Sequence, residues 1–86
     1  MRIGDMRIKV KLFAVARERI GASNVEVEVA SPATVRAVRG ALVEQFPALK
    51  DVVPHVRFAV NSEYAADSVA ISPQCEVAVI PPVSGG

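Results

Sequence analysis

The chain has 86 residues, which is enough for one domain with a single core but not for two. Hydrophobic residues make up 51% of the sequence and charged residues 22%, a balance typical of a folded domain rather than a disordered segment. The net charge is only +1, so the basic excess on which nucleic-acid binding usually depends is absent from the composition, and we expect no nucleic-acid partner.

The sequence also argues against a membrane or secreted protein. It contains no run of about 18 apolar residues that could cross a bilayer, and residues 1–6 lack the apolar centre of a signal peptide. The single cysteine, Cys75, cannot form an internal disulfide and fits a reducing compartment. We therefore expect a cytoplasmic protein with no membrane partner.

The first third of the chain predicts a β-hairpin with a helical turn inside it. Residues 7–13 alternate between charged and apolar side chains, which is typical of a half-buried strand. Residues 14–20 predict a short helical turn that ends at Gly21, a residue suited to a helix C-cap. Residues 25–29 alternate again and predict a second, antiparallel strand, whose outward Glu26 and Glu28 could face the lysines of the first strand.

The pattern then changes to that of a helix. Thr34 is a candidate N-cap, and apolar residues follow at helical spacing until Pro47 ends the helix: Val35, Val38, Leu42 and Phe46. Gly40 lies in the middle of this helix, where glycine costs about 1 kcal/mol relative to alanine. We interpret its presence as a sign of close packing against the sheet.

The remaining segments predict further strands. Residues 57–61 form one strand, Asn61 to Glu63 offer a turn with Tyr64 beyond it, and residues 76–80 form the last strand. The order predicts an α+β domain of β-grasp type, with one main helix over a mixed sheet of four or five strands. We expect a single domain over residues 1–86, with 1–5 as a possible disordered extension and 81–86 as a projecting tail.

Strand parity identifies a candidate docking surface near the tail. If Ile8, Val10 and Leu12 face the helix, then Phe13 points outward, and in the last strand Val77 and Val79 point inward and Ile80 outward. Tyr64 could join Phe13 and Ile80 in an exposed apolar cluster for a protein partner. Alternatively, Phe13 and Tyr64 cap a small second core under a loop, and the sequence leaves both readings open.

The chain offers few groups for catalysis of its own. Its only histidine, His55, lies in an apolar loop, and Cys75 has no second cysteine or nearby histidine with which to form a metal site or a nucleophilic pair. Asp67, Glu63 and Glu76 are scattered acids, and no glycine-rich phosphate loop is present. We therefore predict neither a metal site nor an independent enzyme active site.

The C-terminal residues are the remaining candidate. Pro81 and Pro82 favour extended geometry, and Gly85 and Gly86 add no side chains, so the terminal carboxylate could enter a narrow channel. An extended segment from 81 to 86 reaches roughly 20 Å at about 3.3 Å per residue. The alternative is a frayed terminus that ends in glycine by chance. If a partner enzyme adenylated the carboxylate, a sulfur or amine nucleophile could attack it, and the chain would act as a carrier.

Several short motifs resemble those of one known family. They cover almost the whole chain from Met6 onward: Val10-Lys11-Leu12-Phe13-Ala14, Arg17-Glu18, Thr34-Val35, Ala59-Val60-Asn61, Glu76-Val77-Ala78 and Pro81-Pro82-Val83-Ser84-Gly85-Gly86. The sequence resembles the ubiquitin-like sulfur carriers of β-grasp fold, and among them the MoaD-like small subunit of molybdopterin synthase. A bare Gly-Gly end is shared across these carriers, whereas the full C-terminal motif is more particular to the molybdopterin branch.

The resemblance implies a role for the tail. A MoeB-like enzyme would use ATP to adenylate Gly86, which would then be converted to a thiocarboxylate. The residues before it would insert into a MoaE-like large subunit, where the sulfur passes to cyclic pyranopterin monophosphate; these tail residues are Pro81, Pro82, Val83, Ser84 and Gly85. The resemblance further implies a heterotetramer with the large subunit, catalytic side chains on that subunit, and no permanently bound cofactor.

Two departures and two alternatives accompany this resemblance. Gln74-Cys75-Glu76, which follows Pro73, stands where the family usually has a Gly-Asp-Glu turn before the last strand, and residues 1–5 precede the usual start of the first strand. The chain could instead be another ubiquitin-like carrier or modifier, acting in thiamine synthesis, tRNA thiolation or lysine conjugation. It could also be a β-grasp binding module whose tail plays no part.

Overall fold

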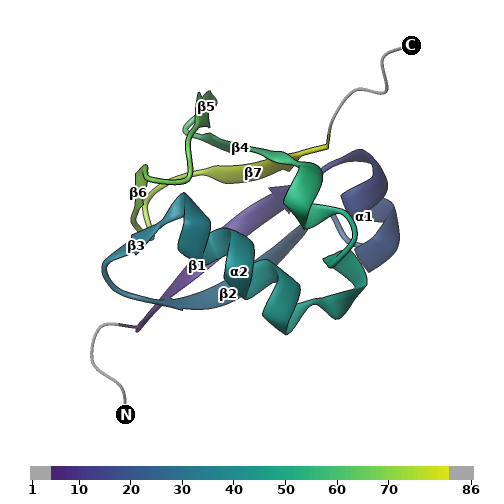
Figure 1. Ribbon diagram of the computed structural model, residues 1–86, viewed down its shortest axis with the longest axis horizontal. Helices are drawn as coiled ribbons and strands as arrows, with labels where there is room; N and C mark the ends of the chain where they lie inside the picture. Colours follow the sequence, from purple (N-terminus) through teal and green to yellow (C-terminus); the bar gives the residue numbers. More distant parts are fainter. Residues whose placement is uncertain (1–4, 82–86) are drawn as a thin grey trace.

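The computed structural model describes residues 5–81, so the predictions for residues 1–4 and for the tail from Pro82 to Gly86 lie outside the described residues. The elements follow one another from β1 to β7 along the chain (Figure 1). They are β1 (Asp5–Leu12), α1 (Ala14–Ile20), β2 (Asn24–Ala30), β3 (Ala33–Thr34), α2 (Val35–Gln45), β4 (Arg57–Val60), β5 (Glu63–Ala65), β6 (Ala70–Ile71) and β7 (Val77–Ile80). Short 3-10 turns at Pro47–Leu49 and Val53–His55 connect α2 to β4.

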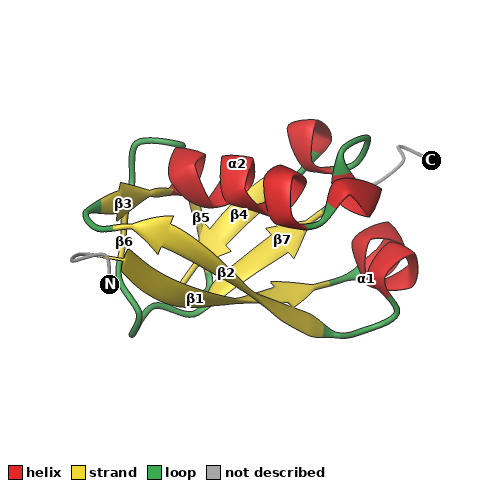
Figure 2. Cartoon of the chain, turned by 90° about the horizontal axis from the view of Figure 1, so that it is seen from below, coloured by secondary structure: helices red, strands yellow, loops and turns green. Residues whose placement is uncertain are grey.

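Five strands form one mixed sheet in the order β2-β1-β7-β4-β5. The central pair, β1 and β7, is parallel, and the other neighbours are antiparallel. Helix α2 lies across one face of this sheet (Figure 2), so the strands bury one side chain in two against it. The predicted β-grasp arrangement, with one main helix on a mixed sheet, is confirmed.

The β1–β2 hairpin follows the predicted alternation and extends it by two residues. Pairing begins at Asp5, opposite Ala30, so β1 starts before the predicted residue 7 and includes one residue of the expected extension. Ile8, Val10 and Leu12 are buried, as predicted. Lys9 lies directly opposite Glu26 in the register, as the sequence suggested, while Arg7 lies opposite Glu28. Arg7 forms ion pairs with both glutamates, at 3.8 Å to Glu26 and 3.4 Å to Glu28.

Helix α1 ends as predicted. Gly21 adopts a left-handed conformation with φ 78°, and its N–H donates to the carbonyl of Arg17 at 2.8 Å. Glycine pays no steric penalty at this angle, which is why the residue suits the C-cap.

Helix α2 is present as predicted, but its start is stabilised differently. Thr34 occupies the N-cap position without a capping hydrogen bond from its side chain. Instead, the N–H of Val35 donates to the carbonyl of Val69 at 2.9 Å, and the N–H of Arg36 donates to that of Asp67 at 3.0 Å. The backbone of the segment before β6 therefore satisfies the first helical N–H groups.

The interpretation of Gly40 is wrong. The residue is exposed, and a Cβ atom added to it would meet nothing within 4 Å. Close packing therefore does not require glycine at this position.

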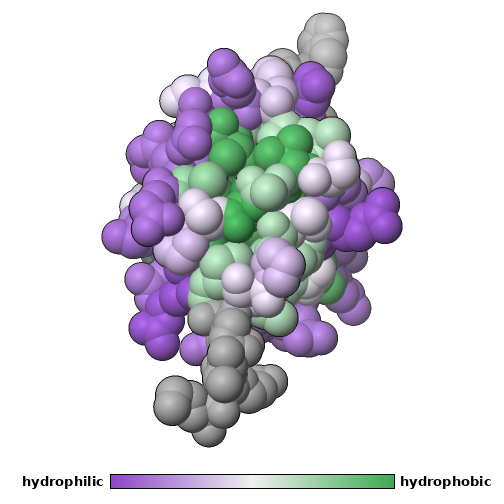
Figure 3. Space-filling view, turned by 90° about the vertical axis from the view of Figure 1, so that its left-hand side faces the viewer, coloured by the Kyte–Doolittle hydropathy of each residue, from purple (hydrophilic) through white to green (hydrophobic). Residues whose placement is uncertain are grey.

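A second sheet was not predicted. It consists of β3 and β6, which pair Ala33 with Ile71 and Thr34 with Ala70. Two residues per strand are too few for a periodic signal, which explains the omission. The end of the molecule formed by β3, β5 and β6 carries a patch of apolar surface ringed by hydrophilic side chains (Figure 3).

The core lies between α2 and the sheet. Its largest fully buried side chains come from both layers and from the connection between them: Phe58, Ile8, Leu12, Leu42, Leu49, Val10, Val27, Val35, Val38, Val53, Val77 and Val79. Val77 and Val79 are the inward residues of β7, as strand parity predicts. Strand β7 is central in the sheet, and the buried side chains of Val77 and Val79 anchor it in the core. The start of the C-terminal segment is therefore held in place.

Candidate functional site

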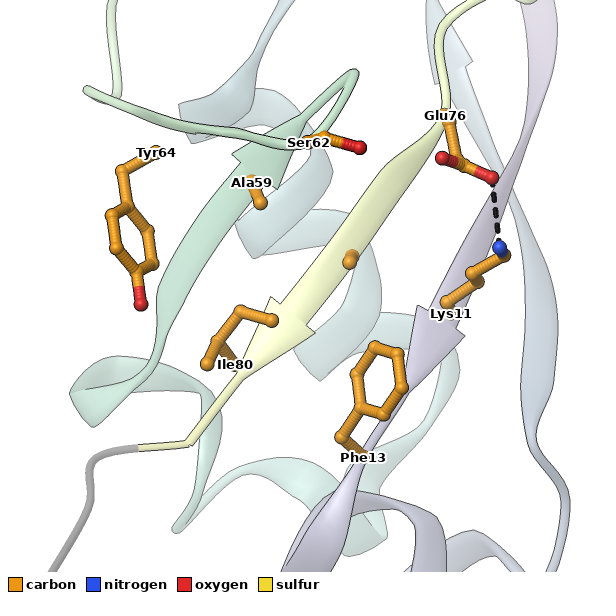
Figure 4. A pocket seen from close by; sticks show the side chains of 8 residues that line it. Lys11, Phe13, Ala59, Ser62, Tyr64, Glu76 and Ile80 are labelled. Atoms are coloured by element: carbon orange, nitrogen blue, oxygen red, sulfur yellow. Dashed lines mark hydrogen bonds and ion pairs between the residues drawn. The ribbon is translucent and has the colours of Figure 1, made fainter.

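A hollow lies on the open face of the sheet, beside the end of β7. It has a volume of about 420 Å³, and Figure 4 shows that side chains from four strands and their connections surround it. Its lining residues are Lys11, Phe13, Ala59, Ser62, Tyr64, Glu76, Ala78 and Ile80. Outward residues of β1, β4, β5 and β7 therefore converge on one site.

The floor of the hollow is made by two small residues. Ala59 of β4 and Ala78 of β7 are directly paired in the sheet, and neither side chain extends beyond its Cβ atom. Larger side chains stand on either side of them, with Tyr64 beside β4 and Phe13 beyond the end of β1 (Figure 4). This contrast in side-chain size creates a depression that can accept a side chain from another protein.

The structure brings the predicted docking residues together. Phe13 is 44% exposed and Tyr64 61% exposed, while Ile80 is half-buried, and all three line the hollow. The alternative in which Phe13 and Tyr64 cap a second core is wrong, because both rings remain open to solvent. Exposed aromatic groups around a depression are typical of protein-binding surfaces.

Tyr64 is positioned by a tight hairpin and by a cation. Asn61 and Ser62 form the two-residue turn between β4 and β5, with φ 53° and 72°. Tyr64 therefore lies opposite Ala59, and the guanidinium carbon of Arg57 lies 4.2 Å from the centre of its ring. This cation–π contact favours an orientation in which the ring flanks the hollow.

The opposite rim is polar. Lys11 Nζ and Glu76 Oε2 form an ion pair of 2.7 Å, drawn in Figure 4. Asn61 holds the turn against the start of β7, since its N–H donates to the Glu76 carbonyl at 2.8 Å and its side-chain oxygen accepts from the Glu76 N–H at 2.9 Å. Two hydrogen bonds thus join the β4–β5 hairpin to the start of β7 beside the hollow.

Sequence reasoning missed five lining residues: Lys11, Ala59, Ser62, Glu76 and Ala78. Parity alone places Lys11 and Ala78 on the open face once β1 and β7 are known to be neighbours. That parallel pairing joins residues far apart in the sequence, and no local pattern reveals it. The ion pair of Lys11 with Glu76 also depends on this pairing of β1 with β7.

The tail predicted from sequence begins at the edge of this site. Pro81 follows β7 directly and is half-buried. The other predicted tail residues, Pro82, Val83, Ser84, Gly85 and Gly86, lie outside the described residues. The described part of the chain therefore fixes where the tail starts, next to Ile80 and the hollow.

The unusual turn before β7 is well formed. The N–H of Cys75 donates to the carbonyl of Ser72 at 3.0 Å, and the Cys75 sulfur lies 3.5 Å from the Ser72 hydroxyl oxygen. The hydrogen bond with the Ser72 side chain lowers the pKa of the Cys75 thiol, with smaller contributions in the same direction from the Ser72 backbone and Asn61, while burial acts against them. A free thiol thus lies close to the hollow but outside its lining.

Other groups that could carry chemistry are scattered. His55 is exposed at the end of a 3-10 turn. Among residues 5–81, no three His, Cys, Asp or Glu side chains gather where they could hold a metal ion. Within the same range, no helix is long and apolar enough to cross a membrane.

Comparisons with known proteins agree with the observed fold and identify the family of the chain. The model of the ThiS family matches residues 10–86. The molybdopterin synthase sulfur carrier subunit of Arabidopsis thaliana is 41% identical over 82 residues, covering 95% of this chain and 85% of the plant protein. The crystal structure of small archaeal modifier protein 1 from Haloferax volcanii superposes with a TM-score of 0.81 at 37% identity, covering 94% of this chain and all of the archaeal one.

A further solved structure shares the fold at greater distance. It is the complex of subunits 1 and 2 of the molybdopterin-converting factor from Helicobacter pylori, in which the matching chain gives a TM-score of 0.65 at 18% identity. The match covers 94% of this chain and all of that one.

Proposed function

This chain belongs to the ThiS family, and from that premise we propose that it is the sulfur carrier subunit of a molybdopterin synthase. The observation that carries the proposal is its similarity, over nearly its whole length, to sulfur carrier subunits of that enzyme. The structure is consistent with a carrier role because a hollow flanked by exposed aromatic side chains lies beside Pro81, where the tail begins.

The carboxylate of Gly86 is the proposed sulfur-bearing group. It attacks the α-phosphate of ATP in an activating enzyme, pyrophosphate leaves, and the resulting acyl-adenylate is open to a nucleophile. Sulfur at the sulfide level, delivered by a sulfur donor as HS⁻, then attacks the acyl carbon, AMP leaves, and a thiocarboxylate remains on Gly86. The family match that extends to residue 86 supports this assignment. ATP is consumed by the activating enzyme and is not a resident cofactor of this chain.

The large subunit of the synthase is the proposed acceptor. The tail from Pro81 to Gly85 enters it, and the sulfur passes to cyclic pyranopterin monophosphate. The Helicobacter pylori complex of two subunits is consistent with such a partner, and a heterotetramer is the proposed assembly. In this proposal the catalytic side chains belong to the large subunit.

The hollow is the proposed docking point for both partners in turn. An apolar side chain on the partner would rest on Ala59 and Ala78, between Phe13 and Tyr64, while the Lys11–Glu76 pair meets the polar edge of the interface. A half-buried Ile80 links the hollow to Pro81, so docking there aligns the tail with the partner's channel.

A second function is favoured by one specific similarity. The small archaeal modifier protein 1 of Haloferax volcanii is 38% identical over 84 residues, so the activated carboxylate could instead pass to a lysine of another protein. Conjugates larger than the free chain on a denaturing gel would indicate this function. A thiocarboxylate without conjugates would indicate the sulfur carrier.

If the hollow is a docking site, a larger side chain in it should weaken binding without destabilising the fold. Ala78→Leu places three additional carbon atoms over its floor, and we expect affinity for the large subunit to fall at least about tenfold while the melting temperature changes little. The matched control is Ala37→Leu, on an exposed position of α2, which should bind normally. Isothermal titration calorimetry checks both variants, and equal affinities would contradict the docking role.

A further inference from the structure

Strand β2 is an edge strand whose outer side faces no other strand of the five-stranded sheet. It spans seven residues, Asn24–Ala30, whereas the strand at the opposite edge, β5, has three. A long free edge is a ready template for pairing with another chain, and natural proteins usually block it. A group that covers the outer side of β2 is therefore expected.

The pairing with β1 shows which backbone groups point outward. The N–H of Leu12 donates to the carbonyl of Ser23, and antiparallel pairs alternate between hydrogen-bonded and non-bonded residues. The backbone groups on the free edge therefore belong to alternate residues of β2: Asn24, Glu26, Glu28 and Ala30. All four residues are exposed.

One of these four positions is occupied by a side chain from α2. Gln45, the last residue of the helix, accepts from the Glu28 N–H at 3.2 Å and donates its amide to the Glu28 carbonyl at 3.0 Å. Its carboxamide thus copies the pair of hydrogen bonds that a neighbouring strand would make. Because Glu28 lies third of the four, the described residues leave Asn24 and Glu26 as the only consecutive open positions, and these are too few for a stable strand pair.

The charges on the edge act against a second copy in particular. In the antiparallel register that pairs all four edge residues with those of another copy, Glu26 faces Glu28 of the second copy, and the contact occurs twice by symmetry. Like charges directly opposite one another destabilise a strand pair. The glutamates thus oppose pairing with a second molecule of this chain, and among residues 5–81 a single cation, Arg7, forms ion pairs with them and balances their two charges only in part.

We propose that Gln45 closes the edge of β2 against strand addition by a second copy of this chain, with Glu26 and Glu28 as an electrostatic second barrier. The contact between Gln45 and β2 leaves the hollow on the open face and the end of β7 uncovered. This inference stands apart from the proposed function, because it depends only on the edge and not on the tail.

The test is a comparison of four proteins: wild type, Gln45→Ala, Glu26→Gln with Glu28→Gln, and the triple variant. Analytical ultracentrifugation across a concentration series measures association. We expect wild type to remain monomeric and the triple variant to dimerise at a concentration at least about tenfold below that of either partial variant. Glu44→Ala, at the exposed neighbouring position of α2, is the matched control and should behave as wild type.

Hydrogen exchange at single amides distinguishes loss of the Gln45–Glu28 hydrogen bonds from loss of folding. In dilute, monomeric Gln45→Ala, the Glu28 amide should exchange its hydrogen at least about tenfold faster than in wild type, whereas Val27 and Val29, which bond to β1, keep their protection. Dimers of the triple variant should regain protection at the backbone amides of positions 26 and 28, which are glutamines in that variant. A folded triple variant that stays monomeric, or dimers protected elsewhere, would overturn the proposal.

Discussion

At the scale of single residues, Arg39 is a side chain that joins several elements. It projects from α2, and its guanidinium donates to the carbonyls of Val53 and Val56 at 2.8 and 3.2 Å and to Asp67 at 3.0 Å. The guanidinium carbon also lies 4.8 Å from the centre of the Phe58 ring. Since only 24% of the side chain is exposed, these contacts are largely shielded from water. One residue thus ties the helix to the two segments around β4 that lead into the hollow.

Replacing Arg39 with alanine should therefore destabilise the fold. We expect the free energy of unfolding to fall by about 2 kcal/mol, because two buried carbonyls and Asp67 lose their donor. Arg36→Ala, one turn earlier on the exposed side of the same helix, should change it by less than about 0.5 kcal/mol. Urea denaturation measures both, and similar losses in the two variants would argue against this role for Arg39.

At the scale of elements, the β4–β5 hairpin decides the shape of the site. Its two-residue turn has positive φ at both positions, the geometry that matches the twist of paired strands. Asn61 tolerates this conformation and adds two hydrogen bonds to Glu76, but Ser62 adopts it at a steric cost. The turn is thus anchored by its first residue and strained at its second.

Ser62→Gly should consequently stabilise the protein. Glycine reaches φ 72° without the clash of a Cβ atom, and we expect a gain of about 0.5 kcal/mol after its greater entropy in the unfolded state is included. Ser62→Val, a β-branched residue poorly suited to positive φ, should lower stability. Thermal melts followed by circular dichroism check the pair, and a glycine variant less stable than the valine variant would refute the explanation.

Local pattern and long-range contact differ in what they reveal about these elements. Alternation in β1, β2 and β7 predicted their buried faces, because successive side chains of a strand point to opposite faces and the pattern is therefore visible in adjacent residues. The β3–β6 pair, the backbone caps on Val35 and Arg36, and the Lys11–Glu76 ion pair depend on residues distant in sequence, and no local pattern contains them. The apolar members of the site were therefore predictable, and its alanine floor and polar rim were not.

At the scale of the whole molecule, the fold assigns different tasks to the two faces of the sheet. The inner face packs against α2 and holds β7 in the centre. The open face bears the hollow next to the residue where the C-terminal segment begins. A rigid domain that presents a docking surface and an adjacent tail is well suited to delivering a small reactive group to a partner's active site. This division of tasks is the physical basis for the proposed carrier role.

The most direct test of the proposed role is the intact mass of the chain after incubation with a MoeB-like activating enzyme, ATP and a sulfur donor. Exchange of one carboxylate oxygen for sulfur predicts a gain of about 16 Da, confined to the C-terminal peptide that ends at Gly86 and unchanged in Cys75→Ser. A chain lacking Gly85 and Gly86 should show no gain. An unaltered mass, or a gain of about 32 Da on the peptide that contains Cys75, the mark of a persulfide, would contradict the assignment of Gly86 as the sulfur carrier.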